Sequence, residues 1–301
     1  MQQYAPIVLF VYNRPHHTKQ TLQKLKENTL ASKSDLIIYS DGPKNASDSP
    51  KVSEVRQIID SIDGFSNITR IDHSKNKGLA ASIIEGVSEV IGRYNRIIVL
   101  EDDLVTSPYF LEYMNEGLAT YKNTANVFSI SGYTPQIAIP KDYKDPVYWV
   151  PRCASWGWGT WADRWEKADW AVSNFIDFMK DPKAQEKFNY GGNDMTGMLQ
   201  QQMSGNLDSW AIRWCFSHYQ NQAGCIYPTK SKVINIGIDG SGTHHAVTTD
   251  KYNTPLDLEK PHPFPVKLEP NIQISRQFKS FHDISEWIRF KRMILRILKS
   301  L

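Results

Sequence analysis

Residues 96–103 read RIIVLEDD, and this stretch decides what kind of fold the chain is expected to adopt. The apolar run from Ile97 to Leu100 is typical of a buried strand, and three carboxylates follow it without a break. Adjacent carboxylates repel one another, so a cation must offset that cost. Oxygen ligands suit Mg²⁺ or Mn²⁺, which commonly bridge one or two carboxylates to the phosphates of a substrate. The alternative is a solvated turn whose acids cap the helix expected after Ser107 and Pro108.

On both sides of this stretch, short apolar runs alternate with segments whose apolar residues recur at helical spacing. Strands are expected at residues 7–12, 36–40, 68–72, 96–100 and 127–131. Strands that alternate with helices predict βαβ units and a mainly parallel sheet. The expected fold class is therefore α/β.

Polar residues follow three of these expected strands, at 13–14, 41–42 and 101–103. Sheets of this kind bind ligands at the carboxyl ends of their strands. The first strand leads into Tyr12-Asn13-Arg14-Pro15 rather than into a G-x-G-x-x-G or Walker glycine fingerprint. This argues against Rossmann-type dinucleotide binding and against P-loop chemistry.

Charge and cysteine content narrow the class of protein further. The formal net charge is only +3, which is too small to indicate binding of nucleic acid, and none is expected as a partner. The basic character is concentrated in residues 285–301, which carry five basic side chains against one acidic one. The three cysteines have no metal-ligand spacing, so a reducing compartment is expected. The apolar run at 7–12 is too short for a signal peptide or a membrane span, which favours the cytoplasm.

Residues 96–110, RIIVLEDDLVTSPYF, followed by Glu112-Tyr113, closely resemble the metal-site segment of N-acetylglucosaminyltransferase I-like enzymes. These are inverting glycosyltransferases of the GT-A fold. Further stretches fall in the expected order: NKGL at 76–79, SISG at 129–132, SWGWG at 155–159 and LDSWAIR at 207–213. The resemblance covers about residues 6–245, and the acidic segment is its most specific part.

The resemblance implies a donor site at the strand ends. Asp103 is similar to the metal-coordinating carboxylate of the family, and the metal would be Mn²⁺ or Mg²⁺. The residues that would contact the nucleotide sugar are Arg14, Asp41, Lys77, Glu101 and Asp102. Among them, Asp41 is expected to accept a hydrogen bond from the uracil of a UDP-sugar. The acceptor would be a saccharide or a lipid-linked saccharide.

Asp208 is the candidate catalytic base implied by the same resemblance. An inverting transfer needs one base for the acceptor hydroxyl and charge stabilisation for the leaving diphosphate. The family carries two acids where this chain has Asp208 and then Ser209, and of these two only Asp208 can accept a proton near neutral pH. The alternative role of Asp208 is the N-cap of a helix over 209–220.

Two further features could serve the ligands. Trp156 and Trp158 flank a glycine and are candidates for exposed indole faces that bind an acceptor sugar, and the alternative is a packed core. Gly240, His244 and His245 lie in a glycine-rich stretch that is expected to form a mobile lid, and the alternative is an ordinary surface loop.

The composition shifts after about residue 140, where prolines and then tryptophans become frequent. We expect a nucleotide-sugar-binding α/β subdomain over 1–140 and an acceptor-side, smaller helical region with the lid over 141–249. An extended wrap and a basic amphipathic helix are expected over 250–301. Residues 285–301 are typical of a helix drawn to an anionic membrane surface, which would make the protein peripheral on the inner face of the membrane; a helix docked on the body is the alternative.

Two other classes of protein remain open at this point. A sugar nucleotidyltransferase also joins a parallel sheet to a metal-binding acid, although a glycine-rich basic loop would be expected after its first strand. A non-catalytic carbohydrate-binding protein would explain the tryptophans but not the acidic triplet.

Overall fold

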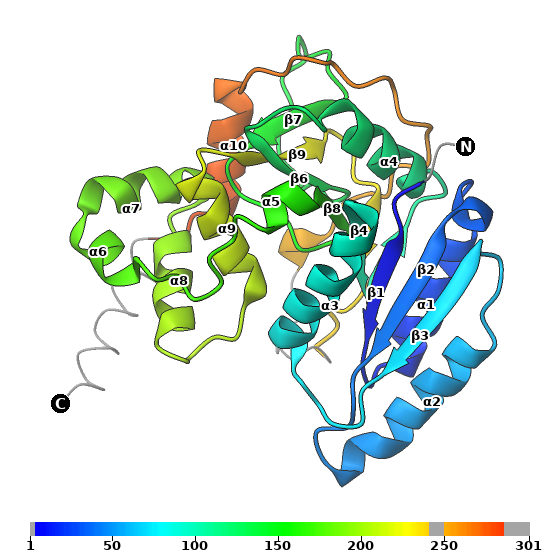
Figure 1. Ribbon diagram of the computed structural model, residues 1–301. Coiled ribbons are helices and arrows are strands. Elements are labelled where there is room, and N and C mark those ends of the chain that lie inside the picture. Colours follow the sequence, from blue (N-terminus) through cyan, green and yellow to red (C-terminus); the bar gives the residue numbers. More distant parts are fainter. Residues whose placement is uncertain (1–3, 241–249, 286–301) are drawn as a thin grey trace.

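The computed structural model describes residues 4–240 and 250–285. Within these residues, the main sheet has eight strands in the order β3-β2-β1-β4-β8-β6-β9-β7, and a separate two-stranded sheet pairs β10 with β5. Figure 1 shows the β1–β3 end of the main sheet standing free of the helical region formed by α6, α7 and α8. The α/β fold class with a mainly parallel sheet is confirmed.

The first half of the sheet is parallel and follows the apolar runs of the sequence. Its strands are β1 (Ile7–Val11), β2 (Asp35–Ser40), β3 (Asn67–Asp72) and β4 (Arg96–Glu101). β1 lies between β2 and β4 and pairs in parallel with both. Three of these strands are buried almost throughout, as expected for parallel strands covered on both faces, whereas β3 lies at the edge and is largely exposed.

The second half of the sheet departs from sequence order. β8 (Trp158–Trp161) pairs antiparallel with β4 and with β6 (Val127–Ser131). β9 (Gly224–Pro228) continues in parallel with β6, and β7 (Val147–Val150) closes the edge antiparallel to β9. The sheet therefore runs across residue 140, where we expected one subdomain to give way to the next.

The helices before residue 140 cover both faces of the sheet. They are α1 (Pro15–Lys26), α2 (Ser49–Asp60), α3 (Leu79–Tyr94) and α4 (Phe110–Thr120), with short 3₁₀ turns η1 (Ala31–Lys33) and η2 (Ala46–Asp48). Because strand side chains alternate between faces, Val8 and Phe10 join one core with α3, whereas Ile7 and Leu9 join the other with α1.

The remaining helices gather on the α3 side of the molecule and along the wrap. They are α5 (Ala162–Trp165), α6 (Phe175–Lys180), α7 (Pro182–Phe188), η3 (Asn189–Gly191), α8 (Met195–Met203), α9 (Trp210–Gln220), η4 (Asp250–Tyr252) and α10 (Ile272–His282). Residues 253–271 cross the surface without regular structure, as the proline-rich sequence predicts. The tail helix expected over 285–301 lies, from residue 286, outside the described residues.

Two observations bear on the environment of the chain. Cys153, Cys215 and Cys225 are all buried free thiols, and the sulfur atoms of Cys153 and Cys215 are 3.2 Å apart. Among the described residues, no helix is both long enough and apolar enough to cross a membrane.

Candidate donor and acceptor site

The carboxyl ends of β1, β2 and β4 bring the predicted strand-end residues together at one edge of the sheet. Arg14 follows β1, Asp41 follows β2, and the acidic triplet ends β4. We call Arg14, Asp41, Glu101, Asp102 and Asp103 the strand-end cluster. Asp103 lies 89 positions after Arg14 in the sequence, and the pairing of β1 with β4 makes the two residues neighbours.

The strongest contact in this cluster joins Arg14 to Asp103. Arg14 Nη1 donates to Asp103 Oδ2 at 2.7 Å, and both side chains are about five-sixths buried, with exposed fractions of 16% and 15%. Arg14 Nη1 also lies 4.0 Å from Asp102 Oδ1. Charge-assisted hydrogen bonds of this length are the strong ones, so the guanidinium is the cation that offsets the repulsion of the triplet.

Burial and mutual repulsion alter the acidity of the other two carboxyls. Burial, and then the charge of Asp103, raises the pKa of Asp102 to about 7, although the backbone N–H of Tyr12 donates to Asp102 Oδ2 at 3.1 Å. Burial followed by the charges of Asp103 and Asp102 raises the pKa of Glu101 well above its usual range. The edge therefore carries more negative charge than its surroundings accommodate, and added positive charge would be stabilising there.

A second segment of chain lies over Asp103. β10 (Val233–Asn235) pairs antiparallel with β5 (Leu104–Thr106), directly after the triplet. This pairing puts Asn235 Nδ2 3.5 Å from Asp103 Oδ1. The chain then passes so close that a Cβ on Gly237 would collide with the Asp103 carboxylate and the Arg14 guanidinium, which explains glycine at this position.

Beyond Gly237, Asp239 reaches back to the same cation. Asp239 Oδ1 lies 3.7 Å from Arg14 Nη2, and Asp239 Oδ2 lies 3.1 Å from His17 Nε2 on the first turn of α1. Asp239 is 46% exposed, so this contact lies on the solvent side of the Arg14–Asp103 pair. Arg14 is thus held between a carboxylate beneath it and another above it.

The chemistry of the donor set fits a divalent cation at Asp103. Carboxylate oxygen is the ligand that Mg²⁺ prefers, and this ion usually takes one or two carboxylates together with substrate phosphates and waters. Within residues 4–240 and 250–285, no three His, Cys, Asp or Glu side chains are grouped to hold a metal by themselves. Asp103 would therefore supply one ligand, and a diphosphate and water would supply the others.

Asp41 has a structural role that the sequence did not reveal. Its carboxylate accepts hydrogen bonds from Asn76 Nδ2 and from the backbone N–H groups of Lys77 and Gly78, at 2.9–3.2 Å. Asp41 therefore holds the loop that leads into α3. The ammonium of Lys77 contacts Glu85 Oε2 at 2.6 Å, on the next turns of α3.

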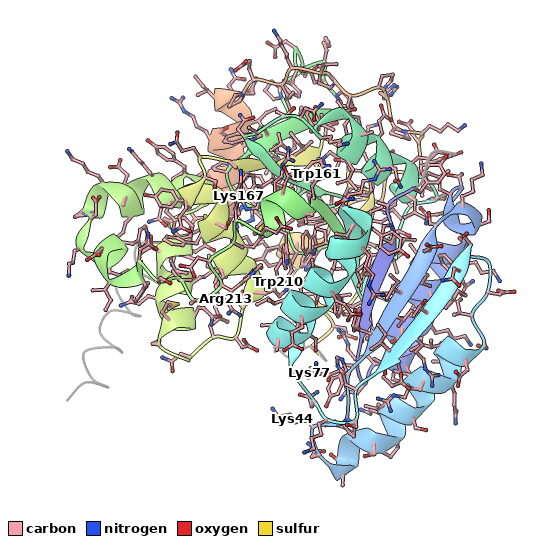
Figure 2. All side chains as sticks on the ribbon, viewed as in Figure 1. Lys44, Lys77, Trp161, Lys167, Trp210 and Arg213 are labelled. Carbon is pink, nitrogen blue, oxygen red and sulfur yellow. The ribbon has the colours of Figure 1, made fainter. Side chains whose placement is uncertain are left out.

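Asp208 lies across from that loop. A Cβ built on Gly78 would lie 3.7 Å from Asp208 Oδ2, and Gly78 has a φ of +80° that favours glycine. Figure 2 labels Lys77 below α3 and shows Trp210 and Arg213 on α9, which packs against α3. Asp208 is exposed and lies beside the loop that Asp41 holds.

The alternative role of Asp208 as a helix cap is wrong. Ser209 is the N-cap residue of α9, and its side chain accepts from the backbone N–H of Ile212 at 3.4 Å. Ser209 N–H in turn donates to Gln202 Oε1 at 2.6 Å. The side chain of Asp208 is therefore not used as a cap.

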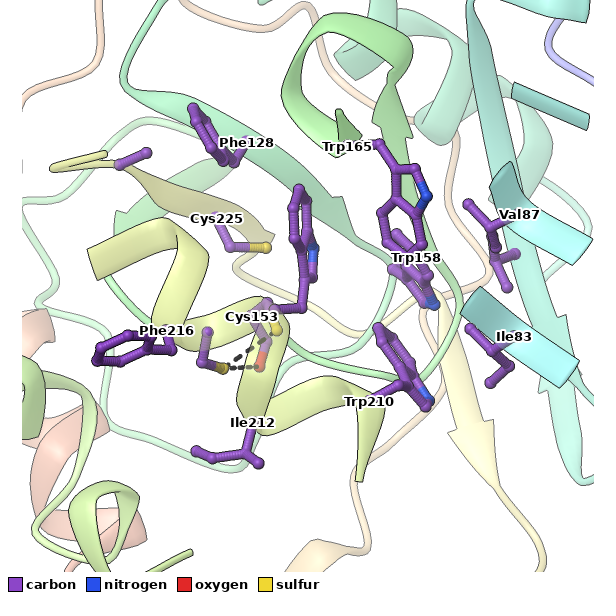
Figure 3. Close-up of a cluster of buried hydrophobic side chains, with 14 of the residues drawn as sticks. Ile83, Val87, Phe128, Cys153, Trp158, Trp165, Trp210, Ile212, Phe216 and Cys225 are labelled. Carbon is purple, nitrogen blue, oxygen red and sulfur yellow. Dashed lines mark hydrogen bonds between the residues drawn. The ribbon is translucent and has the colours of Figure 1, made fainter. Parts of the chain in front are cut away.

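The expectation of an exposed face on Trp158 is wrong. Trp158 lies in β8, is 1% exposed, and stacks between Trp210 at 4.8 Å and Trp165 at 5.6 Å. Figure 3 shows these indoles facing Ile83 and Val87 of α3 in a packed interior. A central strand between two covered faces leaves no indole surface for a sugar, so the core alternative holds for this residue.

Trp156 differs from Trp158 because it lies in the loop before β8 and is half-buried. Its ring packs edge-on against Tyr133 at 4.5 Å and against Tyr252 at 5.8 Å. These three rings form an aromatic surface between the sheet and the wrap. Trp156 thus remains a candidate for acceptor binding.

Part of the expected lid is described and part is not. Gly240 is exposed and has a φ of +86°, a conformation that glycine adopts readily. His244 and His245 lie outside the described residues.

Sequence reasoning missed three residues of this site: His17, Asn235 and Asp239. His17 follows Arg14 by three positions, which is one helical turn, so its place beside the cluster could have been read from the helix that Pro15 begins. Asn235 and Asp239 were out of reach, because their positions depend on the pairing of β10 with β5.

The chain belongs to glycosyl transferase family 2, whose sequence model matches residues 7–183. The mainly parallel sheet flanked by helices agrees with the GT-A fold. The matched range includes Arg14, Asp41 and the acidic triplet but ends before Asp208. The finer resemblance to N-acetylglucosaminyltransferase I-like enzymes stays a prediction.

Two solved structures are similar to this chain. The mannosyltransferase PcManGT from Pyrobaculum calidifontis, in complex with GDP-Man and Mn²⁺, has a TM-score of 0.40 and 11% identity, covering 55% of this chain and 47% of that one. S. aureus TarS has a TM-score of 0.43 and 9% identity, covering 76% of this chain and 36% of that one. The chain thus spans about half or less of the length of each. A search of curated protein sequences gave no match.

Proposed function

We propose that the protein transfers a sugar from a nucleotide sugar, with UDP as the expected nucleotide, to a hydroxyl group of a saccharide or lipid-linked saccharide. The observation that carries the proposal is the Arg14–Asp103 pair at the adjacent ends of β1 and β4, in a chain of a glycosyltransferase family. This pair joins a group that can bind phosphate to a group that can bind a cation. A diphosphate leaving group needs both.

In this proposal residues 1–140 bind the donor. Arg14, Lys77, Glu101 and Asp102 are the contacts to the nucleotide sugar, and Asp41 shapes the loop beside the nucleobase. A guanidinium suits a diphosphate because its fork can donate two parallel hydrogen bonds. A hydrogen bond from uracil to Asp41 is a further part of the proposal. It would share the carboxylate with the backbone N–H groups of Lys77 and Gly78, which already donate to it.

Asp103 would hold the divalent cation, Mn²⁺ or Mg²⁺. When bound, such an ion neutralises the charge that develops on the departing diphosphate. The chain itself contributes Arg14 on the same side, and Gly237 passes so close to Asp103 that a side chain there would collide with the carboxylate.

Asp208 is the proposed base. An exposed carboxylate beside Gly78 is able to take the proton of an acceptor hydroxyl as that oxygen attacks the anomeric carbon, which would invert its configuration. Trp156 would bind the acceptor sugar, and residues 141–249 would form the acceptor side. Gly240, His244 and His245 would close over the donor.

The sequence of residues 285–301 supports a further part of the proposal, namely contact with an anionic membrane surface. Five basic side chains share the segment with Phe290, Ile294 and Leu298. This would bring the enzyme to a lipid-linked acceptor, on the inner face of the membrane.

The test is calorimetric titration of UDP, and of GDP for comparison, with and without Mn²⁺. Wild type is compared with Asp103→Asn and with a matched control, Asp177→Asn, whose carboxylate is 86% exposed on α6. We expect UDP binding that requires Mn²⁺ and Asp103 and that Asp177→Asn leaves unchanged. Binding of GDP but not of UDP would mean that the donor is a GDP-sugar rather than a UDP-sugar. No nucleotide binding with any metal would overturn the proposal and favour a carbohydrate-binding protein.

A further inference from the structure

We propose that Arg14 is a resident counter-ion that competes with the divalent cation for Asp103, and that Asp239 and His17 hold it there. The cation would then bind together with the diphosphate rather than before it. This inference rests on the proposed function, because it concerns the binding of metal and donor at the same site. Asp239 and His17 are its new positioning residues.

The guanidinium and a metal ion would compete for the same carboxylate. Arg14 Nη1 donates to Asp103 Oδ2 at 2.7 Å, and the other oxygen, Oδ1, faces Asn235 Nδ2 at 3.5 Å. A metal ion takes a carboxylate oxygen at about 2 Å. The guanidinium takes part of the acceptor capacity of Asp103 and places positive charge beside it, so Arg14 weakens the binding of a second cation to the same carboxylate.

A second carboxylate forms an ion pair with the other terminal nitrogen of the guanidinium. Asp239 Oδ1 lies 3.7 Å from Arg14 Nη2, while Asp239 Oδ2 lies 3.1 Å from His17 Nε2. His17 is itself buried on α1, with a side chain that is 11% exposed. Asp239 is thus steadied by a ring from a rigid helix, and Arg14 is held between two carboxylates.

Gly237 places the connecting segment against this pair. The backbone of Gly237 lies so close to the pair that a Cβ added to it would collide with both Asp103 and Arg14. The segment that carries Asp239 is therefore in contact with the ion pair rather than merely near it.

A diphosphate would reverse this arrangement. Its oxygens offer the guanidinium a bidentate partner of higher charge than a carboxylate. Once Arg14 turns to the phosphates, Asp103 Oδ2 is released to accept the metal. Diphosphate and metal therefore raise each other's affinity, and by linkage the two factors must be equal.

The test measures Mn²⁺ binding to the full chain without nucleotide, from the electron paramagnetic resonance signal of the free ion. We expect weak binding to wild type and an affinity roughly tenfold higher in Arg14→Gln, because a charge-assisted hydrogen bond no longer competes. Arg14→Lys keeps the charge but loses the fork, so its affinity should lie between the two. The matched control is Arg93→Gln, which removes a 69% exposed guanidinium at the end of α3 and should leave Mn²⁺ binding unchanged.

The same titrations with UDP give the coupling between nucleotide and metal. We expect UDP to raise the affinity for Mn²⁺ by a much larger factor in wild type than in Arg14→Gln, where the competitor is absent. Wild type alone provides a test that needs no variant: strong binding of Mn²⁺ without any diphosphate would overturn the inference.

Asp239→Asn separates positioning from coordination. If Asp239 holds Arg14 in place, this variant binds Mn²⁺ alone a few-fold more tightly than wild type does. Weaker binding would make Asp239 a metal ligand and would overturn its positioning role.

The outcomes distinguish this inference from the proposed function. If UDP and Mn²⁺ bind in a manner that requires Asp103, but Arg14→Gln does not strengthen binding of the metal alone, the inference fails and the donor site stands. If UDP and Mn²⁺ do not bind wild type at all, the proposed function itself fails. Thermal unfolding of each variant confirms that the compared proteins are folded.

Discussion

The strand-end cluster and the tryptophan cluster (Trp158, Trp165, Trp170, Trp210 and Trp214) differ in how their side chains find partners, and of the tryptophans in this cluster only Trp158 was a candidate for ligand binding. The tryptophans stack on one another at 4.5–6.1 Å in the interior. Their ring faces are covered by one another and are not available to a ligand. In the strand-end cluster, burial first and the neighbouring carboxylates second raise the pKa values of Asp102 and Glu101, so added positive charge would be stabilising there.

The difference teaches that adjacent carboxyl groups buried at a strand end are a better guide to a site than an abundance of aromatic residues. The two regions are nevertheless connected. Trp210 begins α9 directly after Asp208 and Ser209, and it stacks on Trp158 of β8 at 4.8 Å. The tryptophan cluster thus acts as the foundation that positions the candidate base.

The largest effect is expected from Asp208→Asn. Loss of a general base should lower the rate of transfer from a UDP-sugar by roughly 10²–10⁴-fold, with little change in UDP binding or in stability. The measurement is release of UDP in the presence of a panel of saccharides, with Asp177→Asn as the control. A rate close to that of wild type would place the base elsewhere.

The tryptophan cluster is tested by Trp158→Ala. Removal of a fully buried indole should lower the free energy of unfolding by about 3–5 kcal/mol, as read from urea denaturation. Trp156→Ala, two positions earlier but half-buried, should cost less and should weaken acceptor binding instead. Equal losses in the two variants would remove the distinction between core and surface tryptophans.

Stability should also depend on pH through His218, which lies beside Trp214. Its Nδ1–H donates to the Trp214 carbonyl at 2.8 Å, Nε2 contacts the Ser129 hydroxyl at 2.6 Å, and burial lowers the pKa of the imidazole to about 4. Between pH 6.5 and pH 4, His218 binds a proton in the unfolded chain but stays neutral in the folded chain. Stability should therefore fall by about 3 kcal/mol as the pH drops from 6.5 to 4.

His218→Gln should lose this component of the pH dependence, whereas His262→Gln, at an exposed position, should keep it. The comparison uses urea unfolding of metal-free protein at several pH values. An unchanged slope in His218→Gln would mean that other groups control acid stability.

The smallest effect is expected from Gly237→Ala. The added Cβ must push the segment away from Asp103 and Arg14, which should lower the stability by about 1–3 kcal/mol. Gly205→Ala is a control for a loop glycine, because a Cβ there meets no atom within 4 Å, although its positive φ adds some strain. A loss of stability no larger than that of Gly205→Ala, read from urea denaturation, would contradict the close approach.

Much of the fold could be predicted from the sequence, because strands in the parallel half of the sheet coincide with apolar runs that end in polar residues. Asp103 and Arg14 could be singled out for the same reason. The place of β8 could not, since the run Trp158–Trp161 inserts between β4 and β6 through pairings with distant strands. Trp158 was misjudged for that reason, and the contacts of Asp239, 222 residues from His17, were equally hidden.

The most direct test of the account is a crystal structure with UDP and Mn²⁺, in which anomalous scattering locates the metal. The account predicts a manganese peak within coordination distance of an Asp103 oxygen, with the diphosphate against Arg14 and the tryptophan cluster free of ligand. A peak remote from Asp103, or a nucleotide seated among the indoles, would contradict the claim that the strand-end cluster is the donor site.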